Sequence, residues 1–227
     1  MALDELKKVA AEKAVEQVES GMVLGLGTGS TTRYAVEKIG QLWQAGALKD
    51  IVGVPTSEGT STLARQYGLP LATLDEQPTL DLVIDGADEV DPELNLVKGL
   101  GGALLREKMV AMAAERFVVV VDESKLVEKL GTHAPLPVEV VQFGWKTQMR
   151  WLEQLGCQPA RRGGGEQPYV TDNCNYIIDC TFPYGIDNPA ALSAVLRARI
   201  GLVEHGLFLR MAHQVIVARA DGVQILE

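Results

Sequence analysis

The stretch DLVIDGADEVDPELNLVKGLGGALLREK, residues 81–108, contains the features that decide the fold. An apolar run at 82–84 leads into a cluster of acidic residues that begins at Asp85. Lys98 then opens a glycine-rich loop, and this loop leads into a segment of helical character. Because α/β folds bind ligands at the carboxyl ends of buried strands, the acidic cluster is a candidate site.

The residue types in this stretch suit proton transfer. Carboxylates at a strand end, a cationic loop and a carboxylate on a helix can together move protons at an oxygen-rich substrate. The groups concerned are Asp85, Asp88, Lys98 and Glu107. A run of acids is equally typical of a solvated turn, Lys98 of a solvated loop, and Glu107 of an exposed helix face. The residues alone leave both interpretations open.

A second informative segment is MVLGLGTGSTT, residues 22–32. It is typical of a buried strand, a glycine turn and the start of a helix, whose free N–H groups and dipole attract anions. A dinucleotide-binding turn fits poorly, because Ser30 stands where the third glycine belongs and the next strand ends without an acid. The segment therefore indicates either a phosphate site or a simple tight turn.

Apolar strands alternate with helical patterns through the first part of the chain. This alternation predicts an α/β fold, with a Rossmann-like, mostly parallel sheet covered by helices on both faces. The expected strands are 22–26, 50–54, 71–74, 80–85 and 116–121, and the expected helices are 3–19, 31–45, 58–67 and 103–115.

The pattern changes beyond residue 131. A strand–helix–strand–strand–helix–strand order predicts a smaller α+β, ferredoxin-like domain at 132–206, inserted before the last strands. Residues 1–131 and 207–227 would then form the Rossmann-like catalytic domain. The later expected elements are a helix at 143–155, a strand at 169–182, a helix at 189–200 and strands at 202–209, 213–219 and 223–226.

Composition restricts the class of protein. The chain has 227 residues and a net charge of −9, which argues against nucleic acid and anionic membranes as partners. The first residues predict a charged amphipathic helix instead of a signal peptide. Three cysteines without C-x-x-C spacing predict reduced thiols, and hence a cytoplasmic protein.

Taken together, several motifs give the chain, over essentially its whole length, a resemblance to ribose-5-phosphate isomerases of the A type. Leu100 departs from the pattern, because the family often has another glycine there. The matching motifs are GLGTGSTT (25–32), SEGTS (57–61), DGADEVD (85–91), KGLGGALLREK (98–108) and DESK (122–125).

The resemblance implies an aldose–ketose isomerase that interconverts D-ribose 5-phosphate and D-ribulose 5-phosphate. It implies that Glu107 is the base that moves a proton between C2 and C1, and that Asp85 assists opening of the sugar ring. Asp88 would hold substrate hydroxyls, and Lys98, with the N–H groups of the loop that follows, would stabilise the enediolate oxygen.

Phosphate binding is expected at the turn of residues 28–31, together with Lys125 and Lys7. The resemblance also implies a homodimer or homotetramer. The full set of expected substrate- and phosphate-binding residues is Thr28, Gly29, Ser30, Thr31, Gly86, Ala87, Gly99, Leu100, Gly101, Lys125 and Lys7.

Aldose–ketose isomerisation has a second route, a metal-assisted hydride shift, which needs clustered histidine and carboxylate ligands. The histidines here, His133, His205 and His213, are scattered. We therefore expect a cofactor-free enediolate mechanism without a metal. Two other classes stay open: a non-catalytic sugar-phosphate sensor, which would lose the base, and a coenzyme A transferase-like enzyme with its own catalytic glutamate.

Overall fold

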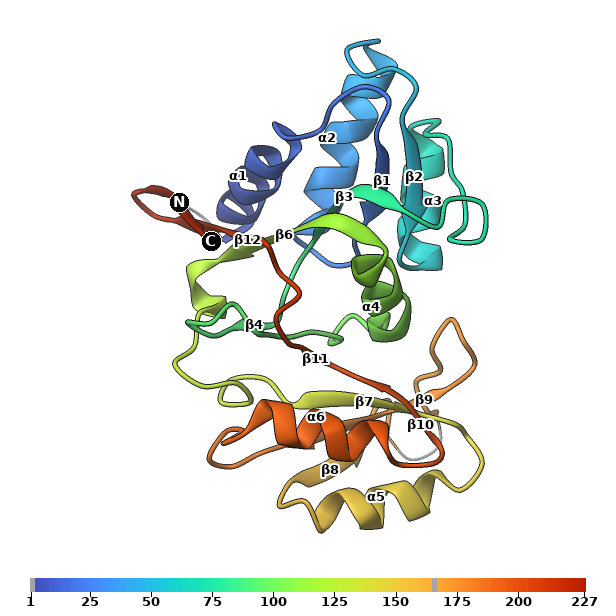
Figure 1. Ribbon diagram of the computed structural model, residues 1–227, viewed down its shortest axis with the longest axis vertical. Helices are drawn as coiled ribbons and strands as arrows, with labels where there is room; N and C mark the ends of the chain where they lie inside the picture. Colours follow the sequence, from blue (N-terminus) through green and yellow to red (C-terminus); the bar gives the residue numbers. More distant parts are fainter. Residues whose placement is uncertain (1–2, 165–166) are drawn as a thin grey trace. The chain divides into compact units, whose positions relative to one another are not determined.

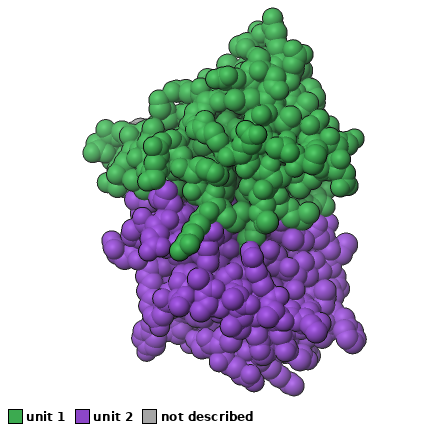
Figure 2. Space-filling view, viewed as in Figure 1, with its two compact units in different colours: residues 1–87, 106–125, 210–227 green, residues 88–105, 126–209 purple. Residues whose placement is uncertain are grey.

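The computed structural model describes residues 3–164 and 167–227. The chain divides into two compact units, coloured separately in Figure 2. The domain boundaries expected from the sequence stay a proposal. The first unit comprises Met1–Ala87, Arg106–Lys125 and Arg210–Glu227, and the second comprises Asp88–Leu105 and Leu126–Leu209.

A six-stranded sheet forms the centre of the first unit, in the order β13-β12-β6-β3-β1-β2. All neighbouring strands are parallel except the final pair, β12 and β13, which confirms the predicted mostly parallel sheet. The strands are β1 (Val23–Leu26), β2 (Val52–Pro55), β3 (Leu80–Asp85), β6 (Ala114–Asp122), β12 (Gln214–Arg219) and β13 (Gly222–Leu226).

Helices cover both faces of this sheet (Figure 1). Alternate strand residues such as Leu82 and Ile84 join one apolar core with the first two helices. On the other face, a Cβ at Gly25 would meet Val83 and Val110, so α4 packs there. The helices are α1 (Leu3–Val15), α2 (Thr32–Gln44), α3 (Glu58–Gln66) and α4 (Leu104–Met112), whose first two residues belong to the second unit.

The second unit contains a four-stranded antiparallel sheet in the order β10-β7-β9-β8. Its elements follow the predicted strand–helix–strand–strand–helix–strand order and enclose a separate apolar core. They are β7 (Leu136–Val140), α5 (Trp145–Glu153), β8 (Gln158–Arg161), β9 (Tyr176–Thr181), α6 (Pro189–Arg197) and β10 (Leu202–His205).

Three expectations about strands differ from the structure. The expected strand 169–182 is observed only as β9, because residues 172–173 form a turn. The segment 71–74 is not a strand, because only Leu71 pairs, in an isolated bridge to Gly53. The expected strand 202–209 divides at Gly206 into β10 and a two-residue strand in another sheet. That additional sheet has the order β11-β5-β4, with β4 (Glu89–Val90), β5 (Leu96–Val97) and β11 (Leu207–Phe208).

Within residues 3–164 and 167–227, none of the helices has the length and apolar character needed to cross a lipid bilayer.

Candidate active site

The turn between β1 and α2 is shaped to receive an anion. Gly29 adopts a φ of 134°, which favours glycine, and the Thr32 hydroxyl donates to the Gly29 carbonyl. Thr31 precedes the helix, yet no side chain caps the helix amino end. Within the first turn, the Arg33 N–H donates to the Gly29 carbonyl at 3.0 Å and the Tyr34 N–H to the Thr31 carbonyl at 3.1 Å. Phosphate binding at this helix end stays a prediction.

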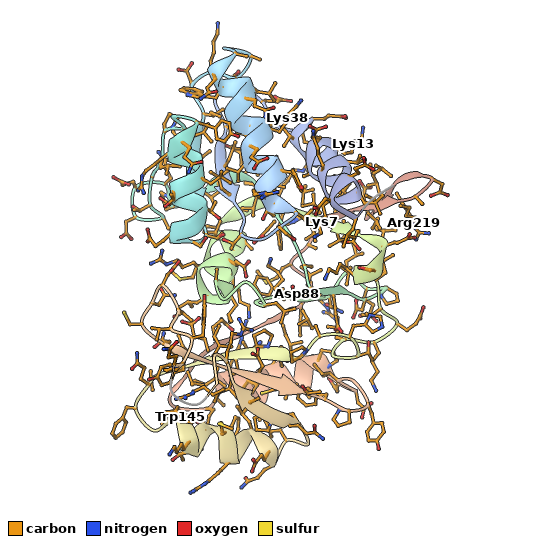
Figure 3. All side chains as sticks on the ribbon, turned by 180° about the vertical axis from the view of Figure 1, so that it is seen from behind. Lys7, Lys13, Lys38, Asp88, Trp145 and Arg219 are labelled. Carbon is orange, nitrogen blue, oxygen red and sulfur yellow. The ribbon has the colours of Figure 1, made fainter. Side chains whose placement is uncertain are left out.

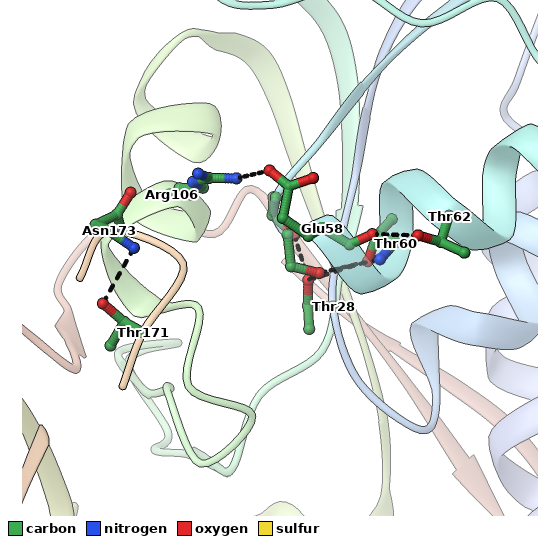
Figure 4. Close-up of polar contacts among 9 residues, drawn as sticks. Thr28, Glu58, Thr60, Thr62, Arg106, Thr171 and Asn173 are labelled. Carbon is green, nitrogen blue, oxygen red and sulfur yellow. Dashed lines mark hydrogen bonds and ion pairs between the residues drawn. The ribbon is translucent and has the colours of Figure 1, made fainter. Parts of the chain in front are cut away.

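Hydroxyl groups of Thr56, Ser57 and Thr60 hold the turn in place through the side chain of Thr28. The Thr28 Oγ1 lies 2.7 Å from the Thr56 Oγ1, 2.8 Å from the Ser57 Oγ and 3.1 Å from the Thr60 Oγ1 (Figure 4). Thr60 also donates to the Gly27 carbonyl at 3.0 Å. This supporting role of Thr56, Ser57 and Thr60 was not predicted from the sequence. A detectable signal existed, since Ser57 caps α3 by accepting the Thr60 N–H.

A cavity of about 280 Å³ opens beside this turn, within the first unit. Its wall includes Thr28, Gly29, Arg33 and Thr60. Nearby Glu37 and Tyr34 engage Arg33, whose guanidinium is 3.4 Å from the Glu37 carboxylate. The cavity gives the glycine turn the open space that a ligand requires.

Asp85 connects the end of β3 to the turn. Its buried carboxylate accepts the Gly86 N–H at 2.7 Å and the Thr28 N–H at 3.2 Å, both at Oδ1. A Cβ at Gly27 would lie only 2.3 Å from the same Oδ1, so only glycine allows this approach. The structure thus brings Asp85, Gly86 and Thr28 together at one edge of the sheet.

Glu107 lies in the first turn of α4 and is only 3% exposed. The interpretation of this residue as part of a solvated helix face is therefore wrong. The preceding residue, Arg106, pairs with the Glu58 carboxylate at 2.8 Å (Figure 4). That hydrogen bond lowers the pKa of Glu58 below its ordinary value.

The two candidate phosphate lysines lie on different elements of the first unit. Lys125 ends the short helical turn that follows β6, a strand adjacent to β3, so it lies at the same sheet edge as Asp85. Lys7 lies on α1, which packs against α2, and its ammonium group is 3.7 Å from Asp4 (Figure 3). Among the described residues, the contacts resolved here tie neither lysine to the turn.

The second unit holds the lysine and its glycine loop. Lys98 is buried, its backbone N–H donates to the Gly206 carbonyl at 2.9 Å, and its ammonium group is 5.5 Å from the centre of the Phe208 ring. The interpretation of Lys98 as a solvated loop lysine is wrong. Gly206 must be glycine, since a Cβ there would lie 2.2 Å from the Lys98 carbonyl oxygen.

Asp88 contacts the loop directly. Its Oδ2 accepts the Leu100 N–H at 2.9 Å, and the Gly102 N–H donates to the Gly99 carbonyl at 2.9 Å. The Leu100 N–H is thus used inside the loop. The next residue, Gly101, is exposed.

His205 and His213 make structural hydrogen bonds, whereas His133 is exposed. His205 is buried, and its Nδ1 accepts the Leu207 N–H, while the His213 Nδ1 accepts the Phe117 N–H. Within residues 3–164 and 167–227, no group of three or more His, Cys, Asp or Glu side chains is arranged to hold a metal ion.

Comparison with known proteins agrees with this arrangement. The family model for ribose 5-phosphate isomerase A (phosphoriboisomerase A) matches residues 52–222. Ribose-5-phosphate isomerase A of Synechococcus sp. (strain JA-3-3Ab) is 53% identical over 98% of this chain and 97% of its own. That of Chloroflexus aurantiacus is 54% identical over 96% of this chain and 91% of its own.

Solved structures give the same result. A D-ribose-5-phosphate isomerase in complex with phospho-erythronic acid superimposes with a TM-score of 0.96 at 43% identity, over 100% of both chains. Ribose 5-phosphate isomerase A from Methanocaldococcus jannaschii gives a TM-score of 0.94 at 41% identity, also over 100% of both chains.

Proposed function

Because the chain belongs to the ribose-5-phosphate isomerase A family and is an isomerase of D-ribose 5-phosphate and D-ribulose 5-phosphate, we propose that it works through a cofactor-free enediolate. Glu107 supports this proposal most strongly. A carboxylate that is 3% exposed at the start of a helix is shielded from water and held in one place. A fixed position suits a general base, which must lie within hydrogen-bond reach of the proton that it removes.

In this proposal, Glu107 removes the C2 proton of the open-chain aldose and returns it to C1. As the C2 proton leaves, negative charge builds on the carbonyl oxygen at C1. That oxygen takes up a proton and the hydroxyl at C2 gives one up, so C2 becomes the new carbonyl carbon. Lys98 and the backbone N–H of Gly101 stabilise that charge, because donors that are already in place need no reorganisation during the reaction. Proton transfer between neighbouring carbons leaves the formula of the sugar unchanged.

Asp85 and Asp88 handle the hydroxyl groups. Asp85 accepts two backbone N–H groups at Oδ1, which orients the carboxylate for opening of the furanose ring. Asp88 uses its Oδ2 to hold the Leu100 N–H. We assign Asp88 two roles, contact with a substrate hydroxyl and support of the loop.

The phosphate group binds at residues 28–31, with Lys125 as the principal cation and Lys7 as a further candidate. Charge-assisted hydrogen bonds to a phosphate are roughly twice as strong as neutral ones. The net charge of −9 makes such a local cationic contact necessary. The remaining contacts fall to the backbone of Gly86, Ala87 and Gly99.

The quaternary state and the location belong to the same proposal. We assign a homodimer or homotetramer because of the family resemblance, and a monomer mass in light scattering would contradict this assignment. We assign a cytoplasmic location because of the reduced thiols. One relative from Arabidopsis thaliana, 53% identical, is a chloroplastic protein. Neither the sensor nor the coenzyme A transferase alternative is favoured by an observation of this site.

Replacement of Glu107 tests the proposal. Glu107→Gln keeps the size of the side chain but removes the base, so kcat should fall by about 10²–10⁴ or more. Its affinity for phospho-erythronic acid, the compound bound in a related isomerase structure, should change little, and its melting temperature should match the wild type. The exposed Glu128→Gln serves as the matched control and should retain full activity. If the kcat of Glu107→Gln stays within about tenfold of the wild-type kcat, another residue is the base, with Asp85 the next candidate.

A further inference from the structure

A guanidinium group connects the glycine loop of the second unit to its four-stranded sheet. Arg162 follows β8 directly, and its Nη1 donates to the Gly99 carbonyl at 2.9 Å and to the Leu100 carbonyl at 3.0 Å. On its other edge, Nε and Nη2 donate to the Asp179 carboxylate at 2.9 and 2.5 Å. All four residues lie in the second unit.

The pair with Asp179 holds the guanidinium in one orientation. The two side chains are only 15% and 21% exposed, so water competes weakly for their hydrogen bonds. Two parallel N–H···O bonds to one carboxylate also fix the plane of the group, which a lysine could not do. The Arg162 N–H donates to the Ile177 carbonyl at 2.9 Å, so the backbone is anchored as well.

Other contacts hold the loop from different directions. Asp88 accepts the Leu100 N–H, as described above. The Tyr169 ring lies against Gly102, where a Cβ would be 2.0 Å from the tyrosine hydroxyl, and it also lies 5.8 Å from the Arg162 guanidinium. The loop is therefore fixed through its carbonyl groups, its N–H groups and its glycine surface.

The loop needs such support because of its composition. Gly99 and Gly102 adopt φ angles of 110° and 84°, and glycine-rich backbone loses more conformational freedom on ordering than other backbone. The Arg162 guanidinium, held in one orientation by Asp179, reduces the number of conformations that the loop can adopt. The Leu100 carbonyl and the Gly101 N–H belong to one peptide group. The hydrogen bond from Arg162 polarises this group, which makes the Gly101 N–H a stronger donor.

We propose that Arg162 is a positioning residue of the isomerase: anchored by Asp179, it fixes the loop of residues 98–102 so that Lys98 and the Gly101 N–H meet the enediolate oxygen. This inference rests on the proposed function, because it takes the charge-stabilising role of the loop as given. Arg162 itself does not contact the substrate. Its effect is on the transition state and passes through the loop.

The first test separates turnover from substrate binding. Arg162→Gln should lower kcat by about tenfold to a hundredfold, since a small displacement of a catalytic group has effects of this size. KM for ribose 5-phosphate should change by less than about threefold, because the phosphate contacts lie on other residues. The exposed Arg150→Gln is the matched control and should leave both constants unchanged.

The second test asks whether Arg162 acts through Lys98. If it does, Arg162→Gln should have little additional effect in a Lys98→Gln background, so the two losses in kcat should be strongly non-additive. Losses that simply multiply would overturn the proposal. So would a folded Arg162→Gln enzyme with the kcat of the wild type.

A third variant covers a failure to fold. If Arg162→Gln melts well below the wild type, Arg162→Lys keeps the charge but loses the planar fork, and its kcat should still fall about tenfold. Wild-type kcat in a folded Arg162→Lys enzyme would overturn the proposal. Failure of the proposed function has a different signature, because the wild type would then isomerise ribose 5-phosphate in D₂O without taking up deuterium at C1 or C2, whatever the kcat of Arg162→Gln.

Discussion

Lys125 ends the helical turn after β6, half-buried at the edge of the sheet where Asp85 also lies. This position suits a cation that binds the phosphate of a substrate whose sugar end reaches the carboxylates. A lysine contributes a single charge without a fixed plane, so its loss affects attraction more than orientation.

We therefore predict a binding defect in Lys125→Ala. KM for ribose 5-phosphate should rise by about tenfold or more, because a charge-assisted contact is lost. The dependence of KM on salt should weaken at the same time, since ionic screening acts on that contact. Steady-state kinetics at two ionic strengths would measure both effects, with exposed Lys8→Ala as the control. An unchanged KM would place the phosphate elsewhere, with Lys7 the next candidate.

Single residues differ in how well the sequence predicted their surroundings. Asp85 could be placed at a strand end, because the apolar run 82–84 of β3 leads directly into it. The burial of Glu107 could not be predicted, since its charged neighbours give that part of α4 the pattern of a solvated face. The contacts of Arg162 could not be predicted, because its partners Asp179 and Gly99 lie far away in the sequence.

At the scale of elements, the turn after β1 depends on a close approach to β3. A Cβ at Gly27 would lie 2.3 Å from the Asp85 carboxylate oxygen and 2.6 Å from the Ile84 carbonyl oxygen. A backbone carbonyl cannot move away cheaply, so one added methyl group must separate the turn from the strand.

Gly27→Ala should therefore lower the free energy of unfolding by about 1–3 kcal/mol, the usual effect of overpacking, and should reduce kcat by displacing Asp85. Gly59→Ala is the matched control. Its Cβ would meet nothing closer than 3.7 Å, and alanine favours the helix, so stability should stay equal or rise slightly. Urea denaturation of both variants measures the difference, and equal stabilities would show that the turn can relax.

The sequence predicted long, periodic elements well and short ones poorly. The alternation of strands and helices placed β1, β3, α2 and α3 near their observed positions. The sheet of β4, β5 and β11 was missed, because a two-residue strand carries no periodicity. The expected strand 202–209 appeared continuous because apolar residues stand on both sides of Gly206, although this glycine divides the segment between two sheets.

The reactivity of the three cysteines measures whether the second unit is packed in the folded protein. Cys157 and Cys180 are buried, whereas Cys174 is exposed. A hydrogen bond between the two buried thiols raises the pKa of Cys180 well above its ordinary value, with burial acting in the same direction, and lowers the pKa of Cys157. Cys180 therefore stays protonated and unreactive near neutral pH.

We predict that a thiol reagent modifies one cysteine rapidly in the native protein, Cys174, and all three after denaturation. Mass spectrometry of the labelled peptides would identify the site. Cys174→Ser should remove the rapid phase and leave activity unchanged. Rapid labelling of Cys157 or Cys180 in the active enzyme would contradict the described packing of the second unit.

Isotope exchange with solvent distinguishes an enediolate from a hydride shift. The chelator-treated enzyme is incubated with ribose 5-phosphate in D₂O until the sugars are at equilibrium, and both are then analysed by NMR. A proton carried by a carboxylate exchanges with solvent, so we predict full activity, with deuterium at C1 of ribulose 5-phosphate and at C2 of ribose 5-phosphate. Complete retention of protium at both carbons, or activity that disappears with the chelator and returns with a divalent ion, would contradict the account in favour of a hydride shift.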